Sequence, residues 1–142
     1  MFTFVDLFAG IGGFHQAMVN LGGTCVFASE IDPYAIETYK QNYHADSARD
    51  ITKVDTNDIA HYDFLCAGFP CQPFSKAGER LGFLDKTKGT LFFEIQRILK
   101  DTKPKYFILE NVKNILTHDH GNTLQIIKTV LDELRCDRPT GD

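Results

Sequence analysis

The sequence lacks three patterns, each of which would assign it to a broad class of protein. It has no run of about 18 apolar residues, so no segment is expected to span a membrane. Its N-terminus has no basic stretch followed by an apolar one, so no signal peptide is expected. Its four cysteines include no pair separated by two residues, so they form no zinc-binding pattern and no metal is expected. These absences favour a cytoplasmic chain with free thiols.

Positive charge is also scarce, because the formal net charge is −4 at pH 7. The charges are unevenly distributed along the chain. The segment from Lys76 to Lys105 has eight basic and four acidic residues, a net +4, which leaves −8 for the rest. Such a segment is either an ordinary solvated surface or a surface that contacts phosphates, and charge alone does not separate these alternatives.

The 142 residues fit one domain, and a hydrophobic content of 43% is enough for a packed core. Apolar runs of strand length alternate with segments whose apolar residues recur every three or four positions. We expect strands at 1–7, 24–29, 47–49, 62–67 and 106–109, and helices at 14–21, 33–43, 91–99 and 124–134. This alternation predicts an α/β fold, a mostly parallel sheet with helices on both faces. Ligands of such sheets bind beyond the carboxyl ends of the strands.

Two of the expected helices have local signals. The first repeats apolar residues at helical spacing, which predicts one buried face made of Phe14, Ala17, Met18 and Leu21. The second starts at Pro33, and Asp32 is expected to cap it.

A glycine-rich turn follows the first strand, within the segment Asp6–Phe14. Its Gly10, Gly12 and Gly13 permit tight turns and let a ligand approach the backbone closely. The turn departs from the dinucleotide-binding pattern, because the third glycine of that pattern falls at His15. A nucleoside ligand without a pyrophosphate is therefore the better expectation.

Two acidic residues follow later strands. Glu30 ends the second strand, where a carboxylate can accept hydrogen bonds from both hydroxyls of a ribose. The alternative is a surface glutamate beside a plain turn. Asp50 is expected either to cap the short segment after Ile51 or to bind an adenine amino group.

The fourth strand leads into a loop, roughly Gly68–Gly89, that contains a cysteine between two prolines. Cys71 is a candidate nucleophile because it lies in this loop, whereas Cys66 lies within the apolar strand and is expected to be inert. His118 and His120 are available for a Cys–His pair, although a solvated surface explains them equally well. Glu110 closes the fifth strand and is expected either to face Cys71 or to cap a helix.

Three segments together resemble the ordered motifs of the cytosine-5 DNA methyltransferases. They are Asp6–Phe14, the loop Gly68–Ser75 and Glu110–Val112, and Gly89–Glu94 matches a further motif between the last two. The resemblance extends to about Leu134. The wording Gly-Phe-Pro-Cys-Gln-Pro-Phe-Ser is similar to the bacterial restriction-modification enzymes, whereas the transfer-RNA relatives usually have Pro-Pro-Cys.

The resemblance implies a fold, a cofactor, a reaction and a role for each matching residue. The fold is the Rossmann-like fold of S-adenosylmethionine-dependent methyltransferases, and the reaction transfers a methyl group to C5 of a flipped-out cytosine. Cys71 attacks C6 of the base, and Glu110 contacts its N3 and amino group. The residues that contact S-adenosylmethionine are Phe8, Gly10, Gly12, Gly13, Glu30, Ile31, Asp50, Ile51, Pro70 and Leu91. The residues that contact DNA are Gln72, Ser75, Lys76, Arg80, Lys86 and Lys88. Arg49 stands where many members have glycine, which is a departure from the family's pattern at this turn.

The family's later motifs and its target-recognition region have no match here. We expect residues 1–135 to be the N-terminal part of the cofactor-binding and catalytic domain, and residues 136–142 to be an irregular tail. The expected partner is double-stranded DNA, in the cytoplasm of a bacterium or encoded by a phage. A complementary C-terminal chain would complete the enzyme, and the isolated chain would be inactive. The alternatives are an inactive cofactor-binding remnant, an RNA cytosine methyltransferase and, disfavoured by the missing glycine, a nicotinamide dehydrogenase.

Overall fold

The computed structural model describes residues 1–70 and 91–136, with the side chains of the last two of these left out. The described residues form two compact units. One contains Met1–Phe69 and Asp101–Glu110, and the other contains the remainder.

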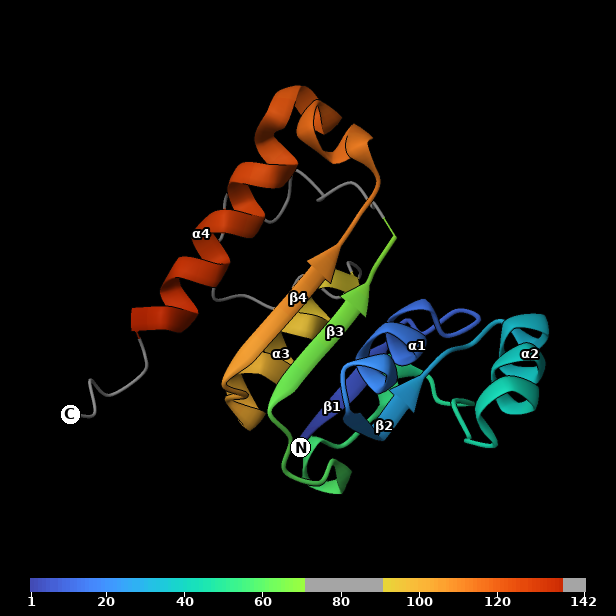
Figure 1. The fold of residues 1–142 in the computed structure, drawn as a ribbon. Helices are drawn as coiled ribbons and strands as arrows, with labels where there is room; N and C mark the ends of the chain where they lie inside the picture. Colours follow the sequence, from blue (N-terminus) through green and yellow to red (C-terminus); the bar gives the residue numbers. More distant parts are fainter. Residues whose placement is uncertain (71–90, 137–142) are drawn as a thin grey trace. The chain divides into compact units, whose positions relative to one another are not determined.

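A parallel four-stranded sheet, with strand order β2-β1-β3-β4, is the framework of the first unit (Figure 1). The strands are β1 (Phe2–Leu7), β2 (Gly23–Ser29), β3 (Phe64–Gly68) and β4 (Tyr106–Glu110). The first unit also contains the helices α1 (Gly13–Asn20) and α2 (Pro33–Tyr43). The helix α4 (Asn122–Cys136) and most of α3 (Leu91–Thr102) belong to the second unit. Strands and helices alternate, so the predicted α/β fold with a parallel sheet is confirmed.

The central strands β1 and β3 are buried on both faces. Phe4, Val5 and Leu7 of β1 and Leu65 and Cys66 of β3 have no measurable exposure. The sequences of these strands are therefore mainly apolar, as expected for the centre of a parallel sheet. In β4, by contrast, buried and exposed positions alternate.

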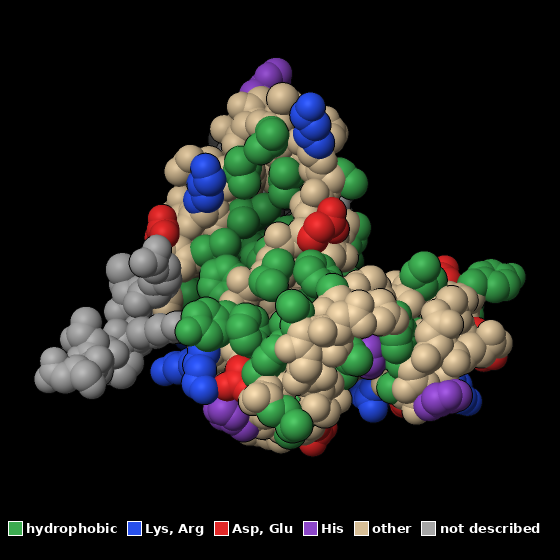
Figure 2. Space-filling model, viewed as in Figure 1, with side chains coloured by type: hydrophobic (Ala, Val, Ile, Leu, Met, Phe, Trp, Pro, Cys, Tyr) green, Lys and Arg blue, Asp and Glu red, His purple; other side chains and the backbone are tan. Residues whose placement is uncertain are grey.

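Hydrophobic side chains reach the surface at β4, which has one paired neighbour among the described strands (Figure 2). Tyr106 and Ile108 of this strand are 59% and 42% exposed. A strand edge with exposed apolar side chains is a surface that favours association with other chains.

The helix α2 has the bounds that the sequence predicted. The Asp32 carboxylate accepts hydrogen bonds from the Tyr34 and Ala35 amides at 2.9 and 2.8 Å, and Pro33 occupies the first turn. The helix α3 also ends before Pro104, as predicted, and buries Ile95, Ile98 and Leu99.

Two predictions of secondary structure were wrong. The strand expected at 47–49 is a single bridge between Glu30 and Ala48, in which the Arg49 amide donates to the Glu30 carbonyl at 3.2 Å. The same amide also donates to the Ser47 carbonyl at 2.7 Å, a local turn that keeps the pairing from extending. The strand expected from Tyr62 starts two residues later, at Phe64.

The predicted buried face of α1 was also partly wrong. Ala17 and Leu21 are exposed, whereas His15 and Met18 are the buried residues of this helix. His15 is buried because its ring packs between aromatic residues of α2, a contact that periodicity in α1 does not reveal.

In the described part of the chain, no helix has the length and apolar character needed to cross a membrane.

Candidate functional site

The loop Phe8–Gly12, which joins β1 to α1, has an unusual backbone. Phe8, Gly10 and Gly12 all have positive φ, at 55°, 54° and 95°. Positive φ is uncommon for a bulky residue such as Phe8, and such residues cluster at functional sites. The Ala9 amide donates to the Ser29 carbonyl at 2.9 Å, which attaches the loop to the end of β2.

The three glycines predicted to line the cofactor lie in two different environments. A Cβ atom added at Gly10 or Gly13 would meet no atom of the described residues within 4 Å, so with respect to these residues both positions face open space. A Cβ atom at Gly12 would instead overlap the ring of Tyr43. Gly10 and Gly13 therefore leave room for a ligand, whereas Gly12 lacks a side chain because the protein itself fills that space.

Glu30 cross-links the glycine loop to the start of α2. One carboxylate oxygen accepts from the Gly10 amide at 2.7 Å, and the other accepts from the Ile31 and Asp32 amides at 2.8 and 2.9 Å. A carboxylate offers about four acceptor positions, so these bonds leave about one for a ligand hydroxyl. The structure thus gives Glu30 a part in shaping the loop that the sequence did not predict.

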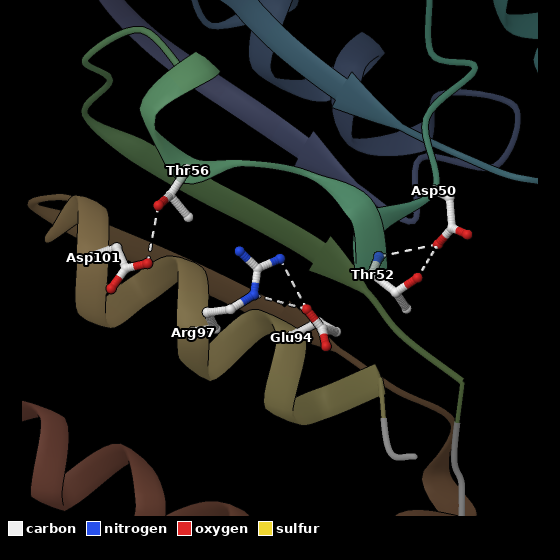
Figure 3. A network of polar contacts seen from close by, with 6 residues as sticks. All are labelled: Asp50, Thr52, Thr56, Glu94, Arg97 and Asp101. Atoms are coloured by element: carbon white, nitrogen blue, oxygen red, sulfur yellow. Dashed lines mark hydrogen bonds and ion pairs between the residues drawn. The ribbon is translucent and has the colours of Figure 1, made fainter. Parts of the chain in front are cut away.

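Asp50 caps the short 3₁₀ helix Ile51–Lys53, which was one of its two predicted roles. Its carboxylate accepts from the Thr52 amide at 3.0 Å and from the Thr52 hydroxyl at 2.7 Å (Figure 3). These hydrogen bonds lower the pKa of Asp50. Ile51 is buried, with 4% exposure, whereas Ile31 is 70% exposed at the end of β2.

Arg49 does not disturb the turn before Asp50, because it is not among the residues with positive φ and glycine is not required there. Its guanidinium donates to the Ala28 and Asp46 carbonyls at 3.2 and 2.6 Å and lies 5.1 Å from the Phe27 ring centroid. The arginine thereby ties the segment after α2 to β2.

Glu110, the predicted catalytic carboxylate, lies beside the end of β3. Gly68 pairs with it in the sheet, and a Cβ atom at Gly68 would lie 3.3 Å from Glu110 Oε2 and 3.9 Å from the Phe14 ring. The absence of a side chain at Gly68 thus leaves space for the carboxylate where β3, β4 and α1 meet.

The predicted nucleophile lies outside the described residues. The same is true of the predicted DNA contacts; these positions are Cys71, Gln72, Ser75, Lys76, Arg80, Lys86 and Lys88. Pro70, the last described residue before them, is exposed, and Leu91, the first residue of α3, is half-buried.

Cys66 has the character that the sequence predicted. It is fully buried in β3, and burial raises the pKa of its thiol to about 12, so it remains protonated. An inert thiol of this kind differs from a reactive cysteine, which needs exposure and a lowered pKa. His118, one of two histidines considered as partners of Cys71, is half-buried and hydrogen-bonded to the Thr123 hydroxyl at 2.6 Å.

Asp6 is a functional candidate that our reading of the sequence did not single out. Its side chain is 1% exposed, and neither oxygen has a hydrogen-bond partner among the described residues. Burial and, to a smaller extent, the charge of Glu30 raise its pKa to about 7, while the His15 amide lowers it in part. A buried, unpaired carboxyl at the carboxyl end of a strand is typical of functional sites. An aspartate within an apolar strand was the available signal.

The ends of β1, β2, β3 and β4 thus bring together an open glycine loop, Glu30, Asp6 and Glu110 at one edge of the sheet. A comparison with known families agrees with this arrangement. The sequence profile of the C-5 cytosine-specific DNA methylases matches residues 2–135. The chain belongs to this family. S-adenosylmethionine is the cofactor that membership implies, and among the described residues no cluster of side chains suits a metal ion.

Bacterial methyltransferases are among its relatives. The chain is 50% identical to the Type II methyltransferase M.HhaI of Haemophilus parahaemolyticus, over 92% of this chain and 40% of the relative. It is 54% identical to M1.ScrFI of Lactococcus lactis subsp. cremoris, over 94% of this chain and 34% of the relative. The chain therefore spans 40% or less of the length of these proteins.

Solved structures show the same fold. Dnmt2 methyltransferase of S. pombe matches with a TM-score of 0.70 and 26% identity, over 94% of this chain and 42% of that protein. A putative DNA modification methyltransferase from an E. coli prophage matches with a TM-score of 0.71 at 22% identity, over 94% of this chain and 38% of that protein.

Proposed function

We propose that this chain carries the cofactor-binding and catalytic part of a DNA (cytosine-5-)-methyltransferase. The observation that carries the proposal is the family match over residues 2–135, which spans nearly the whole chain. Because the chain covers only 40% and 34% of the two bacterial relatives named above, the activity is proposed for the protein or complex that contains this segment. Double-stranded DNA is the proposed substrate.

The residues at the strand ends fit S-adenosylmethionine. Gly10 and Gly13 leave open space beside the backbone, and Glu30 retains acceptor capacity for a ribose hydroxyl. Among the described residues no side chain caps the N-terminus of α1, which leaves the Gly13 amide available to a polar ligand group. When bound, the cofactor supplies a methyl group on a positively charged sulfur.

Cys71 provides the nucleophile of the proposed reaction. Its thiolate adds to C6 of the cytosine, and the new S–C bond moves electron density to C5, which is otherwise a poor nucleophile. After methylation, loss of the C5 proton to a base lets the thiolate leave and restores the aromatic ring. The cytosine must first leave the duplex, because C6 cannot be reached within the base stack.

Glu110 is assigned to the pyrimidine edge that bears N3 and the amino group. A hydrogen bond to N3 stabilises the charge that develops when the thiolate adds. The space beside Gly68 supports this assignment, because the carboxylate lies at the carboxyl end of the sheet and is not covered by a β-carbon at that position. The basic residues Lys76, Arg80, Lys86 and Lys88 are assigned to the DNA phosphates.

Binding of the cofactor is the first test. Isothermal titration of the 142-residue chain with S-adenosylmethionine should show one site, and NAD should not bind. A folded chain that binds NAD instead would contradict the proposal.

Formation of the covalent adduct is the second test. Residues 1–135 would replace the matching segment of M.HhaI, and the chimera would be incubated with DNA that contains 5-fluorocytosine. The adduct should map to Cys71 by mass spectrometry, should vanish in Cys71→Ser and should persist in the matched Cys66→Ser control. An adduct at any other residue of a folded, cofactor-binding chimera would exclude Cys71 as the nucleophile. Competition between DNA and RNA substrates would separate the DNA enzyme from an RNA methyltransferase.

A further inference from the structure

Gly12 is fixed by contacts from the end of α2, outside the glycine loop. The Tyr43 hydroxyl donates a hydrogen bond to the Gly12 carbonyl at 2.9 Å. The same carbonyl accepts from the Gln16 amide at 2.9 Å, within the first turn of α1. Two donors thus occupy the two lone pairs of this carbonyl and fix the orientation of the peptide between Gly12 and Gly13.

The ring of Tyr43 also fills the space beside Gly12. A Cβ atom at position 12 would overlap this ring, so the backbone lies as close to the tyrosine as a glycine permits. With φ at 95° and ψ at 36°, Gly12 begins α1 without a side-chain cap. Tyr43 therefore contributes to this helix start from a position 31 residues away in the sequence.

A rigid aromatic cluster holds Tyr43 itself. Its ring stacks on His15 at a centroid distance of 4.0 Å and meets Tyr39 edge-on at 4.9 Å. His15 Nδ1 and the Tyr39 hydroxyl share a hydrogen bond of 2.5 Å. Burial lowers the pKa of His15 and raises that of Tyr39, so both groups are neutral and this bond persists across the physiological pH range.

Two residues, one before α2 and one at its end, thus hold the glycine loop at two points. Glu30, before α2, binds the Gly10 amide, and Tyr43, at the end of α2, binds the Gly12 carbonyl. Gly13, which faces open space, directly follows the second point. A loop held in its binding conformation before the ligand arrives costs less entropy on binding.

We propose that Tyr43 is a positioning residue for the cofactor: its hydroxyl and ring fix Gly12, and through it the open backbone at Gly13, in the binding conformation. This inference rests on the proposed function, because it takes S-adenosylmethionine as the ligand of the glycine loop. Tyr43 acts through Gly12 and need not touch the ligand itself.

The test is Tyr43→Phe, which removes the hydroxyl and keeps the ring against His15 and Tyr39. Tyr62→Phe is the matched control, because the Tyr62 hydroxyl is also held by one hydrogen bond, of 2.6 Å to the Thr102 hydroxyl, and its side chain is 2% exposed. Each variant loses one hydrogen bond in a tyrosine that stays packed. Affinity for S-adenosylmethionine would be measured by isothermal titration, and melting temperature by circular dichroism.

Tyr43→Phe should weaken the affinity by roughly three- to tenfold, on the scale of one lost hydrogen bond, while Tyr62→Phe leaves it within twofold. Both should lower the melting temperature to a similar extent. Amide exchange in residues 10–14 of the ligand-free chain should quicken only in Tyr43→Phe. Equal affinity in Tyr43→Phe and wild type would overturn the inference, as would equal losses in the two variants or failure of Tyr43→Phe to fold. A folded wild-type chain without affinity for S-adenosylmethionine would instead overturn the proposed function.

Discussion

Replacing Asp6 with asparagine should make the chain more stable at high pH. The substitution removes the part of the pH dependence of stability that comes from ionisation of Asp6. Asp6 is 1% exposed, and its carboxylate has no hydrogen-bond partner among the described residues. Burial without a partner disfavours the ionised form, which raises the pKa from its ordinary value of 3.8 to about 7. Asparagine has nearly the same shape and no charge, so it removes the penalty for ionisation.

The direction and size of the change in unfolding free energy follow from the pKa of Asp6 in the unfolded chain, 3.8, and in the folded chain, about 7. Below pH 4 the carboxyl is protonated in both the folded and unfolded chain, and no penalty applies. Between pH 4 and 7 the unfolded chain loses the proton first, so the free energy of unfolding falls as pH rises. Above pH 7 both states are ionised and the full penalty remains. A pKa difference of about 3, at roughly 1.4 kcal/mol for each pKa unit, gives about 4 kcal/mol.

Urea unfolding followed by circular dichroism at pH 4.5 to 8.5 would measure this effect. The difference in unfolding free energy between Asp6→Asn and wild type should move by about 3–4 kcal/mol in favour of the variant as pH rises. Titration of His15, whose pKa burial lowers, cancels in this difference. Asp63→Asn is the matched control, because Lys105 and Thr3 lower the pKa of Asp63 to about 2 and it stays ionised throughout. A difference for Asp6→Asn that does not change with pH would refute the assignment of a buried, unpaired carboxyl.

Three further predictions concern the glycine loop and the buried thiol. Glu30→Ala should weaken S-adenosylmethionine binding by roughly 1–3 kcal/mol in isothermal titration, and unchanged affinity in a folded variant would exclude the ribose contact. Gly12→Ala should cost about 1–3 kcal/mol of stability in urea unfolding, because it strains the backbone and overlaps a ring, whereas Gly13→Ala should leave stability nearly unchanged and reduce affinity. The reverse pattern would show that the ligand lies beside Gly12 and that the protein fills the space beside Gly13. Cys66→Ser should lower stability by about 1–3 kcal/mol, since it buries a hydroxyl, without changing cofactor affinity; a loss of affinity would contradict its purely structural role.

Sequence patterns predicted those elements whose signals are local. The helix α2 was placed correctly because Asp32 and Pro33 act within one turn of its start. The central strands were visible as apolar runs because they are buried on both faces. The strand expected at 47–49 was wrong because only one bridge forms, between Glu30 and Ala48. The Arg49 amide is shared between the Glu30 and Ser47 carbonyls, a turn that the apolar pattern does not reveal.

The candidate site shows the same contrast between local sequence signals and contacts with distant residues. Motif order identified the family, and it marked Glu30, Asp50 and Glu110 at the ends of elements, where the structure has them. Their detailed environments depend on residues far away in the sequence. Asp50 was predicted with two roles, and the structure confirms the cap while leaving the adenine contact a prediction. The burial of Asp6 was not predicted, because it results from packing around the sheet rather than from its neighbours in the chain.

Glu30 shows why a motif residue can serve the fold and the ligand together. A carboxylate that only bound ribose would stand unpaired in the ligand-free chain, but this one already accepts three backbone amides. Those bonds hold the loop open at Gly10 and stabilise the charge before a ligand arrives. In the proposed cofactor complex, a ribose hydroxyl would add one bond to a group whose orientation is already fixed, which costs little entropy. A glutamine at this position would keep one good acceptor and lose the charge, so Glu30→Gln should impair the loop and the ribose contact together. The position therefore requires a carboxylate, because both of its oxygens accept backbone amides.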